Sequence, residues 1–419
     1  MSSLPARLRP LWPVFKRAHR FLTLIIGVGH RMLSLALGSR GVPRSAYMSS
    51  AEAARAEGEQ IVRTAGGAAY RMDRKIPWGE PSRHRAYLDG QQIDVPERYV
   101  LEVERGCVAG DYGALITPGG RLEYESSPYF RITGWREHPL YLRPTLGERQ
   151  YVPGRVLSLM APGTATNYYH FLYDAIGRLG VIEECGVETA IDAVVVPHRA
   201  RYQRELLEMA GVTAPLISLD RGQCVTADTL VVPSIPNSAV IAPKGTVSWL
   251  RARLLPEDRH TMSERIYITR GQAKGTRRYL QEEDLWPQLE ERGFLRVDPG
   301  SLTVREQIAL FARAQMVVSP HGAGLSNITF AQPGVQVLEF FAPSYVHLGL
   351  WGICEAIGDV RYRYLVGEGP TLPRHLPRPF DDISLEPRRL VKVIDLMIAE
   401  IEAAGHGTMS THRRRDDKE

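Results

Sequence analysis

A histidine and two glycines stand close together in the segment 320-PHGAGLSN-327, directly after an apolar run. We expect the apolar run to form a buried strand and a helix to begin near Leu325. Gly322 and Gly324 would let a ligand approach the backbone, and the start of the helix would offer unpaired N–H groups. His321 could donate a further hydrogen bond. This chemistry favours a phosphate or diphosphate, although a glycine-containing turn alone is a weak signal.

Three arginines and a glutamate follow other apolar runs. Arg270 and Glu339 each end such a run, and Arg277 and Arg278 lie in the loop after Arg270. The carboxyl ends of parallel strands meet at one edge of a sheet, where open sheets bind ligands. Guanidinium groups hold phosphate oxygens, and a carboxylate suits the hydroxyls of a ribose, so the set predicts a nucleotide site. The alternatives are an interior ion pair for Glu339 and a solvated loop charge for Arg277.

A second group of polar residues lies in the segment 166-TNYYHFLYDAIGRL-179. If a helix begins after Asn167, then His170, Asp174 and Arg178 lie four residues apart on one face. A carboxylate beside an imidazole fixes its tautomer and raises its basicity, which suits a general base. The alternative is an ion pair between Asp174 and Arg178 on the helix surface, with His170 packed near the helix start. The spacing alone favours this ordinary arrangement.

The elements that would position these residues alternate between strands and helices from about residue 156 onward. Apolar runs suited to strands buried on both faces are followed by amphipathic segments, and this pattern predicts parallel sheets covered by helices. The expected strands are 193–197, 229–233, 266–269, 316–319 and 335–341, and the expected helices are 199–210, 245–255, 281–292, 303–313 and 345–357.

A polar stretch at 256–264 is interpreted as an interdomain linker. It divides the chain into an N-terminal domain, residues 51–258, and a C-terminal domain, residues 259–402. The first of these is expected to begin with short strands and glycine turns between residues 99 and 122. Residues 403–419 are polar and are expected to form a disordered tail.

The positive charge of the 419-residue chain is concentrated at its N-terminus. Residues 1–51 contain eight basic residues and no acidic one, which leaves 44 basic and 47 acidic residues, a net charge of −3, for the rest. A body of this charge argues against nucleic-acid binding, which needs a basic surface. The composition, with 44% hydrophobic residues, is that of a globular protein. The four cysteines form no CxxC pair, which fits a reducing compartment.

The basic segment 1–50 also carries apolar residues at helical spacing. Its longest uncharged stretch, residues 21–29, is too short to cross ~30 Å of hydrocarbon. We therefore expect an amphipathic helix, with residues 1–45 lying on an anionic membrane surface. The corresponding location is cytoplasmic and peripheral on the inner face of the cell membrane. The alternative is a terminal helix docked on the protein itself.

The motifs together resemble those of glycosyltransferase family 61, which includes enzymes of bacterial capsular polysaccharide biosynthesis. The runs RIYITR, GFLRV and LTVREQIALFARAQMVVSPHGAGLSNITFAQPGVQVLEF carry the resemblance between residues 265 and 342, and NYYHFLYD is similar to the family's N-x-x-H-F-x-x-D segment. The order and spacing of these motifs are specific, whereas HGAG alone is not. Residues 1–150 show no such resemblance.

The resemblance implies a GT-B fold, in which two Rossmann-like α/β domains face a central cleft and the C-terminal one binds the donor. It implies inverting transfer from a nucleotide sugar, generally a UDP-sugar, without an obligatory metal. Carried onto this chain, it assigns Glu339 to the ribose and places His170 and Asp174 opposite, in the N-terminal domain. The residues that it assigns to the diphosphate are Arg270, Arg278, His321, Gly322, Ala323, Gly324 and Asn327.

The sequence therefore predicts a glycosyltransferase in which His170, oriented by Asp174, deprotonates an acceptor hydroxyl. Asp174 itself remains an alternative base. The expected partners are a nucleotide-sugar donor, a glycan or lipid-linked glycan acceptor and the membrane surface, with neither metal nor nucleic acid. Two other classes stay open: a nucleotide-binding protein without transferase activity, and a membrane-surface assembly partner in a polysaccharide-synthesis complex.

Overall fold

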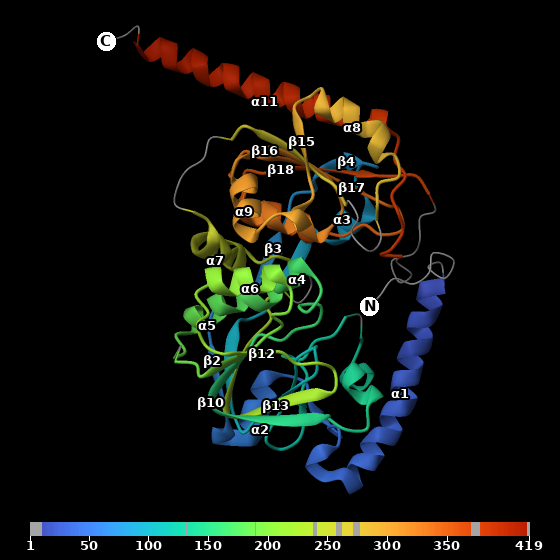
Figure 1. Cartoon of the computed structure of the whole chain (residues 1–419), viewed down its shortest axis with the longest axis vertical. Coiled ribbons are helices and arrows are strands. Elements are labelled where there is room, and N and C mark those ends of the chain that lie inside the picture. Colours follow the sequence, from blue (N-terminus) through green and yellow to red (C-terminus); the bar gives the residue numbers. More distant parts are fainter. Residues whose placement is uncertain are drawn as a thin grey trace.

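The computed structural model describes residues 11–130, 132–188, 190–237, 241–256, 262–270, 277–369 and 378–416. Two main β-sheets, one of ten strands and one of six, each covered by helices, form the two halves of the molecule (Figure 1). We refer to them as the ten-stranded half and the six-stranded half. The mixed α/β class expected from the alternating pattern is confirmed.

All strands of the six-stranded sheet are parallel, in the order β15–β14–β16–β17–β18–β4. Strand β17 is buried at every residue, as expected where helices cover both faces of a sheet. Because the strands are parallel, their carboxyl ends share one edge. The strands are β4 (Trp78–Glu80), β14 (Glu264–Ile268), β15 (Phe294–Val297), β16 (Ala314–Pro320), β17 (Gln336–Phe341) and β18 (Arg361–Val366).

The helices of this half follow the strands closely in sequence. Helix α9 begins with a capping box, in which the side chain of Thr303 accepts from the backbone of Glu306 and that of Glu306 accepts from the backbone of Thr303. The segment after β16 forms a 3₁₀-helix, η9 (Ala323–Phe330), where a helix was expected. Helix α9 spans Val304–Ala312, and the other helices are α8 (Glu282–Glu290), α10 (Gly349–Ile357) and α11 (Pro387–Asp416).

The ten-stranded sheet is mixed. Strand β13 pairs in parallel with β10 and antiparallel with β6 and β7. The antiparallel part comes from the region in which short strands with glycine turns were expected. Its strands are β1 (Ala46–Tyr47), β2 (Ile61–Ala65), β6 (Tyr99–Glu104), β7 (Cys107–Ala109), β8 (Ala114–Ile116), β9 (Leu122–Glu123), β10 (Glu148–Ser158), β11 (Ala193–Val195), β12 (Leu216–Ile217) and β13 (Gln223–Pro233).

Helices α2 (Ser50–Glu57), α5 (Leu179–Cys185), α6 (Arg201–Met209) and α7 (Lys244–Leu254) accompany this sheet, and β3 (Tyr70–Asp73) pairs with β5 (Gln92–Val95) in a separate ribbon. One segment, residues 78–89, crosses from the ten-stranded half to the six-stranded half. Strand β4 pairs with β18, and helix α3 (Arg85–Asp89) packs beside it, where the ring of Tyr87 stacks on Tyr364. Residues 78–89 therefore belong to the six-stranded half, although they precede the linker expected at 256–264.

The two halves share one hydrophobic core, which extends from Leu157 and Leu172 in the first to Val317 and Val337 in the second. Polar contacts cross the same junction. The hydroxyl of Tyr168 donates to Asn327 Oδ1 at 2.8 Å. The halves are thus held together by burial as well as by hydrogen bonds.

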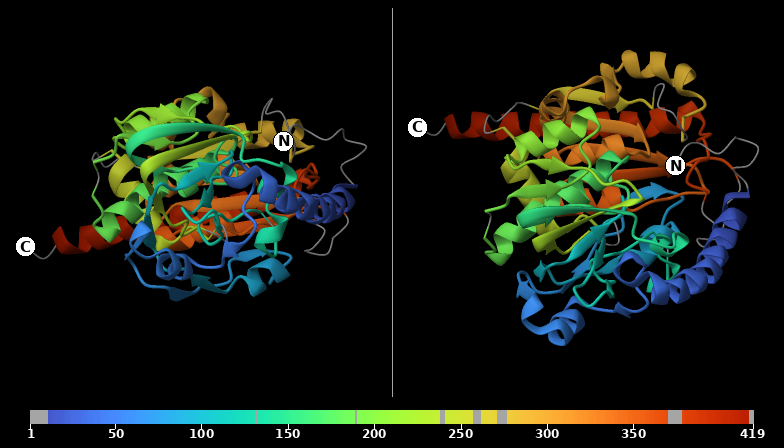
Figure 2. Two further views of the ribbon diagram at one scale, coloured as in Figure 1. Left: turned by 90° about the horizontal axis from the view of Figure 1, so that it is seen from below. Right: turned by 60° about the horizontal axis from the view of Figure 1, so that its bottom comes forward.

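Both ends of the described chain are helical. Helix α1 (Trp12–Leu37) lies along the outside of the ten-stranded half, as both views in Figure 2 show. It contacts the short helices η4 (Trp135–Glu137) and η5 (Pro139–Leu142). At the other end, α11 continues to Asp416, whereas a disordered tail was expected from residue 403.

Arg178 is buried at the junction between helix and sheet in the ten-stranded half. Its guanidinium donates to the carbonyl of Met160 at 3.0 Å and, through Nε, to that of Pro233 at 2.9 Å. Burial lowers the pKa of Arg178 to about 10, so the side chain stays charged at neutral pH. Its role is therefore to satisfy buried backbone carbonyls, not to form the surface ion pair considered above.

Replacing Arg178 by Met should lower the free energy of unfolding by about 2–5 kcal/mol, because two buried carbonyls lose their donor. The matched control is Arg199→Met, since Arg199 forms an exposed ion pair with Asp220 at 2.8 Å. That change should cost at most about 1 kcal/mol. Urea denaturation followed by circular dichroism measures both, and equal losses would contradict the structural role of Arg178.

Candidate functional site

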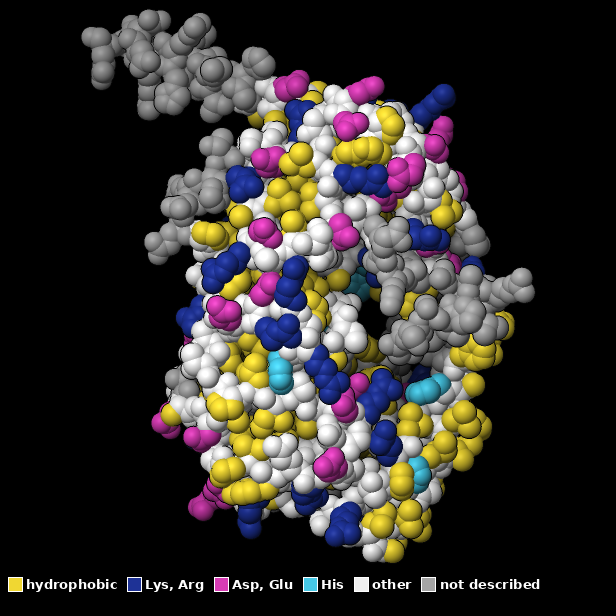
Figure 3. Space-filling model, viewed as in Figure 1, with side chains coloured by type: hydrophobic (Ala, Val, Ile, Leu, Met, Phe, Trp, Pro, Cys, Tyr) yellow, Lys and Arg dark blue, Asp and Glu magenta, His cyan; other side chains and the backbone are white. Residues whose placement is uncertain are grey.

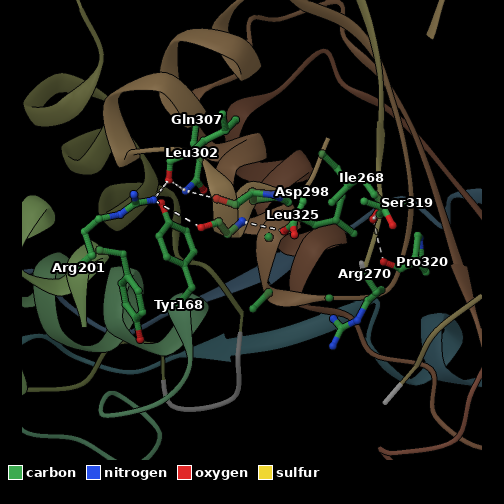
Figure 4. A pocket seen from close by; sticks show the side chains of 17 residues that line it. Tyr168, Arg201, Ile268, Arg270, Asp298, Leu302, Gln307, Ser319, Pro320 and Leu325 are labelled. Atoms are coloured by element: carbon green, nitrogen blue, oxygen red, sulfur yellow. Dashed lines mark hydrogen bonds between the residues drawn. The ribbon is translucent and has the colours of Figure 1, made fainter. Parts of the chain in front are cut away.

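A cavity of about 320 Å³ lies between the two halves, at the carboxyl ends of β14 and β16 (Figure 4). Tyr168 and Arg201 line it from the ten-stranded half, and Arg270, Pro299 and Gly322 line it from the six-stranded half. Its volume falls in the range of small-molecule sites. Parallel sheets bind ligands at this edge, so the cavity lies where the sequence placed a nucleotide site.

Arg270 and the HGAG turn meet on one wall of this cavity. A Cβ atom on Gly322 would lie 2.3 Å from Nη1 of Arg270, so any side chain at residue 322 would displace the guanidinium. Ala323 and Gly324, at the start of η9, line the same wall. The structure therefore brings together Arg270 and the three small residues that the sequence assigned to an anion.

Arg277 lies beside Arg270. Burial and the neighbouring Arg277 lower the pKa of Arg270 to about 10, and burial also lowers the pKa of Arg277. The Nε atoms of both are buried and have no hydrogen-bond partner among the described residues. Nor does either guanidinium pair with a carboxylate in the part of the chain that the structure describes. Two desolvated cations in this state favour an anionic ligand.

Arg278 differs from the expectation that it holds the diphosphate. Its side chain is 61% exposed and pairs with Asp382 at 3.2 Å, and its backbone N–H donates to the same carboxylate. Consecutive residues of this loop point in different directions, with Arg277 in the left-handed region at a φ of 67°. Arg277, which was considered a solvated loop charge, is thus the arginine that joins Arg270.

His321 forms a hydrogen bond of 2.6 Å between its Nδ1 and Oε1 of Glu339 on β17. The second carboxylate oxygen accepts from the hydroxyl of Tyr362, also at 2.6 Å. Burial raises the pKa of Glu339 to about 8, and burial together with Arg277 and Arg270 lowers the pKa of His321 well below its usual value. A neutral imidazole and a protonated carboxyl therefore share this bond at neutral pH.

Glu339 and Asn327 both occupy positions different from those expected. Glu339 has no exposed side-chain surface and both of its oxygens are engaged, so it orients His321 instead of reaching a ribose. Asn327 is also fully buried. Its amide donates to Gln307 at 2.7 Å and its oxygen accepts from Tyr168, which makes it a link between the halves.

His170 and Asp174 form the pair that the second motif predicts, with 2.6 Å between Nδ1 and Oδ2. The other oxygen of Asp174 accepts from the amide of Asn237 at 2.9 Å. The ring of Phe130 lies 5.0 Å from the imidazole, centre to centre. Asn167 caps the helix start as expected, because its side chain accepts from the N–H of Tyr169. The carboxylate is therefore fixed on both sides and holds the imidazole in one orientation.

The helix that carries this pair is irregular. An α-helical turn, α4 (Tyr168–His170), passes into a π-helical segment, Phe171–Ala175, and then into a 3₁₀ turn, Ile176–Arg178. The π segment widens the turn after His170, so the predicted stripe of three residues does not continue to Arg178. Such segments are frequent at functional sites.

Three partners in this site were not predicted. Asn237 is distant in sequence from its partner Asp174, and Tyr362 is distant from its partner Glu339. No local sequence pattern indicates such contacts. Tyr168 stands next to the predicted residues, but its contact with Asn327 depends on how the halves pack. Both Arg277 and Arg278 were considered for the nucleotide site, and the resemblance assigned Arg278 to the diphosphate.

The family model described as Glycosyltransferase 61 matches residues 168–338, about two fifths of the chain. The matched range contains His170, Asp174, Arg270 and the HGAG turn, and it ends one residue before Glu339. None of the curated proteins compared with the chain matches it. The match supports, over these residues, the resemblance drawn from the motifs.

Proposed function

We propose that this protein is an inverting glycosyltransferase of GT-B type that moves a sugar from a nucleotide donor, expected to be a UDP-sugar, to a glycan acceptor. The pathway we propose is the synthesis of a cell-surface polysaccharide of capsular type. One observation carries the proposal: two half-buried arginines, which pair with no carboxylate among the described residues, lie beside His321 in the half opposite the His170–Asp174 pair. Transfer without a metal is part of the proposal and follows from the resemblance.

The diphosphate of the donor would lie against Arg270, Arg277 and the first N–H groups of η9. The first turn of a helix leaves its N–H groups unpaired, and they attract negative charge. With Nδ1 of His321 engaged by Glu339, Nε2 is left to donate to a phosphate oxygen. The nucleoside would extend along the cavity towards Pro299.

The reaction we propose is a single displacement. Nε2 of His170 accepts the proton of an acceptor hydroxyl, whose oxygen forms a bond to the anomeric carbon. The bond from that carbon to the phosphate oxygen breaks on the opposite side, and the electron pair leaves with the nucleoside diphosphate. Arg270, Arg277 and His321 stabilise the departing charge. Both oxygens of Asp174 already accept hydrogen bonds, which favours His170 over Asp174 as the base.

His170→Ala should lower the turnover rate by roughly 10²–10⁴-fold, the usual contribution of a general base, and leave nucleotide affinity nearly unchanged. Release of nucleoside diphosphate measures the first, and calorimetric titration measures the second. His198→Ala is the control, because the hydrogen bonds of its ring to described residues go to Val196 and Ser218 of its own half. Equal losses of turnover and affinity in His170→Ala would indicate a binding residue, and full turnover would show that His170 is not the base. Absence of turnover in the wild-type protein would favour a nucleotide-binding protein without transferase activity.

Arg277→Met and Arg278→Met provide a matched pair at adjacent positions. Loss of Arg277 should weaken UDP binding by roughly 10- to 150-fold, which corresponds to about 1.5–3 kcal/mol for a hydrogen bond to a charged group. Loss of Arg278 should change it little, since that side chain pairs with Asp382. A thermal-shift titration with UDP, GDP, CMP and ADP, with and without EDTA, reports affinity and metal dependence together. The reverse ranking of the two variants would contradict the proposed phosphate site, and sensitivity to EDTA would contradict metal independence.

UDP affinity should fall as the pH rises through about 8, the pKa of Glu339. Below this pH the His321–Glu339 pair holds two protons, one of which is available to the phosphate through Nε2. Above it the carboxylate is ionised, Nδ1–H of the imidazole donates to it, and Nε2 becomes an acceptor facing an anion.

Glu339→Gln tests this assignment without changing the shape of the side chain. The amide can donate to Nδ1 of His321 and accept from Tyr362 at any pH, so the variant should bind UDP at pH 7 and keep its affinity at pH 9. Calorimetric titration between pH 6.5 and 9 measures both proteins. Parallel pH profiles would show that Glu339 is not the group responsible.

A further inference from the structure

Helix α1 packs on the protein through its polar face. Arg20 pairs with Glu137 at 2.6 Å. Nδ1 of His30 lies 2.9 Å from the carbonyl oxygen of Tyr141, and the guanidinium of Arg31 lies 5.1 Å from the centre of the Tyr141 ring. These contacts lie in the middle part of the helix, between residues 20 and 31. The helix is therefore held against η4 and η5 over this stretch.

The opposite face of α1 is apolar and exposed. Only 17% of its most apolar stretch, within Arg17–Arg40, is buried, and Figure 3 shows hydrophobic side chains gathered along this edge of the molecule. A helix docked on a globular protein ordinarily has the opposite arrangement, with its apolar face inward. The exposed apolar residues include Val14 (61%), Phe21 (64%), Ile25 (54%), Val28 (55%), Met32 (64%) and Leu35 (61%).

We infer that α1 lies in the plane of an anionic lipid bilayer and anchors the protein there. Positions 1–51 contain eight basic residues and no acidic one, and the six besides Arg20 and Arg31 complement anionic headgroups. Phe15, Leu22 and Leu33, each more than 40% exposed, widen the apolar face beyond a two-residue seam. A coiled coil with a second copy would need a narrow seam flanked by charges of both signs.

The helix lies in the membrane plane and does not span the bilayer. By length and composition the segment Arg17–Arg40 could cross a bilayer, contrary to the expectation from its uncharged stretch alone. Crossing would require Arg20, His30 and Arg31 to leave their partners and enter hydrocarbon, which is unfavourable for charged groups. An in-plane position keeps these contacts and buries the apolar face.

This anchor has a consequence for the acceptor, and here the inference rests on the proposed function. The segment between Phe130 and Glu137 contacts both α1, through Glu137, and the ring of His170, through Phe130. Phe130 is itself 41% exposed. The proposed base, His170, therefore lies near the side of the molecule that faces the membrane. The acceptor that fits this position is a glycan attached to a membrane lipid.

Vesicle flotation with the full-length chain tests the anchor. Wild type should bind vesicles of phosphatidylglycerol and phosphatidylcholine, bind pure phosphatidylcholine more weakly, and lose affinity at high salt. Ile25→Glu/Met32→Glu should bind at least about tenfold more weakly, because two charges replace exposed apolar side chains. The control Leu295→Glu/Leu396→Glu makes equivalent changes at exposed positions of the six-stranded half and should bind like wild type.

Unchanged vesicle binding by Ile25→Glu/Met32→Glu would overturn the inference. So would a wild-type dimer, seen by light scattering, that this variant converts to a monomer, because the apolar face would then bind a second copy. Retained UDP stabilisation in the variant shows that it is folded. Loss of turnover with a vesicle-borne acceptor but not with a short soluble one is expected; equal turnover on both would overturn the assignment of the acceptor. Absence of UDP binding in wild type would count against the proposed function and leave the anchor standing.

Discussion

The contact between the irregular helix at residues 168–178 and η9 is the interaction on which the site depends. Tyr168 bonds to Asn327, and the hydroxyl of Tyr173 lies 2.5 Å from that of Thr329, within a core shared by both halves. His170 sits on the first element, and the HGAG turn leads directly into the second. Packing between these two short segments therefore sets the separation between the proposed base and the proposed phosphate site. Two segments fixed against each other in this way need little reorganisation to bring their groups together.

Two histidine–carboxylate pairs of almost identical length have different chemistry because their surroundings differ. The His170–Asp174 pair lies at the edge of the junction, with 16% of the imidazole side chain exposed, and its carboxylate is stabilised by Asn237. The His321–Glu339 pair is enclosed beside two arginines, and burial favours the neutral form of both partners. The first arrangement suits a group that takes up a proton during a reaction. The second suits a fixed donor to an anion.

The sequence predicts well whatever depends on neighbouring residues. Strands buried on both faces and a helix beginning after Asn167 follow from patterns of a few residues, and the four-residue spacing made the pairing of His170 with Asp174 one of two alternatives. Positions that depend on distant partners were not predictable in this way. Glu339 and Asn327 were assigned to a ligand because they lie beside the HGAG turn or at a strand end, yet their polar atoms are occupied by Tyr362 and Tyr168. The contact with Tyr362 forms when β17 and β18 pair, and the contact with Tyr168 forms only once the halves have packed.

The segment between Phe130 and Glu137 joins the two proposals physically. It belongs to the part of the chain outside the family match, and it is held by α1 on one side and contacts the imidazole of His170 on the other. The proposed base, which lies within the matched range, is thus bordered by residues outside that range. Because the arginines and the HGAG turn of the proposed phosphate site lie in the six-stranded half, variation in this segment and in α1 can change which acceptor reaches His170 without disturbing the phosphate site. Acceptor choice and membrane attachment would then be properties of one surface, separate from the chemistry that the arginines support.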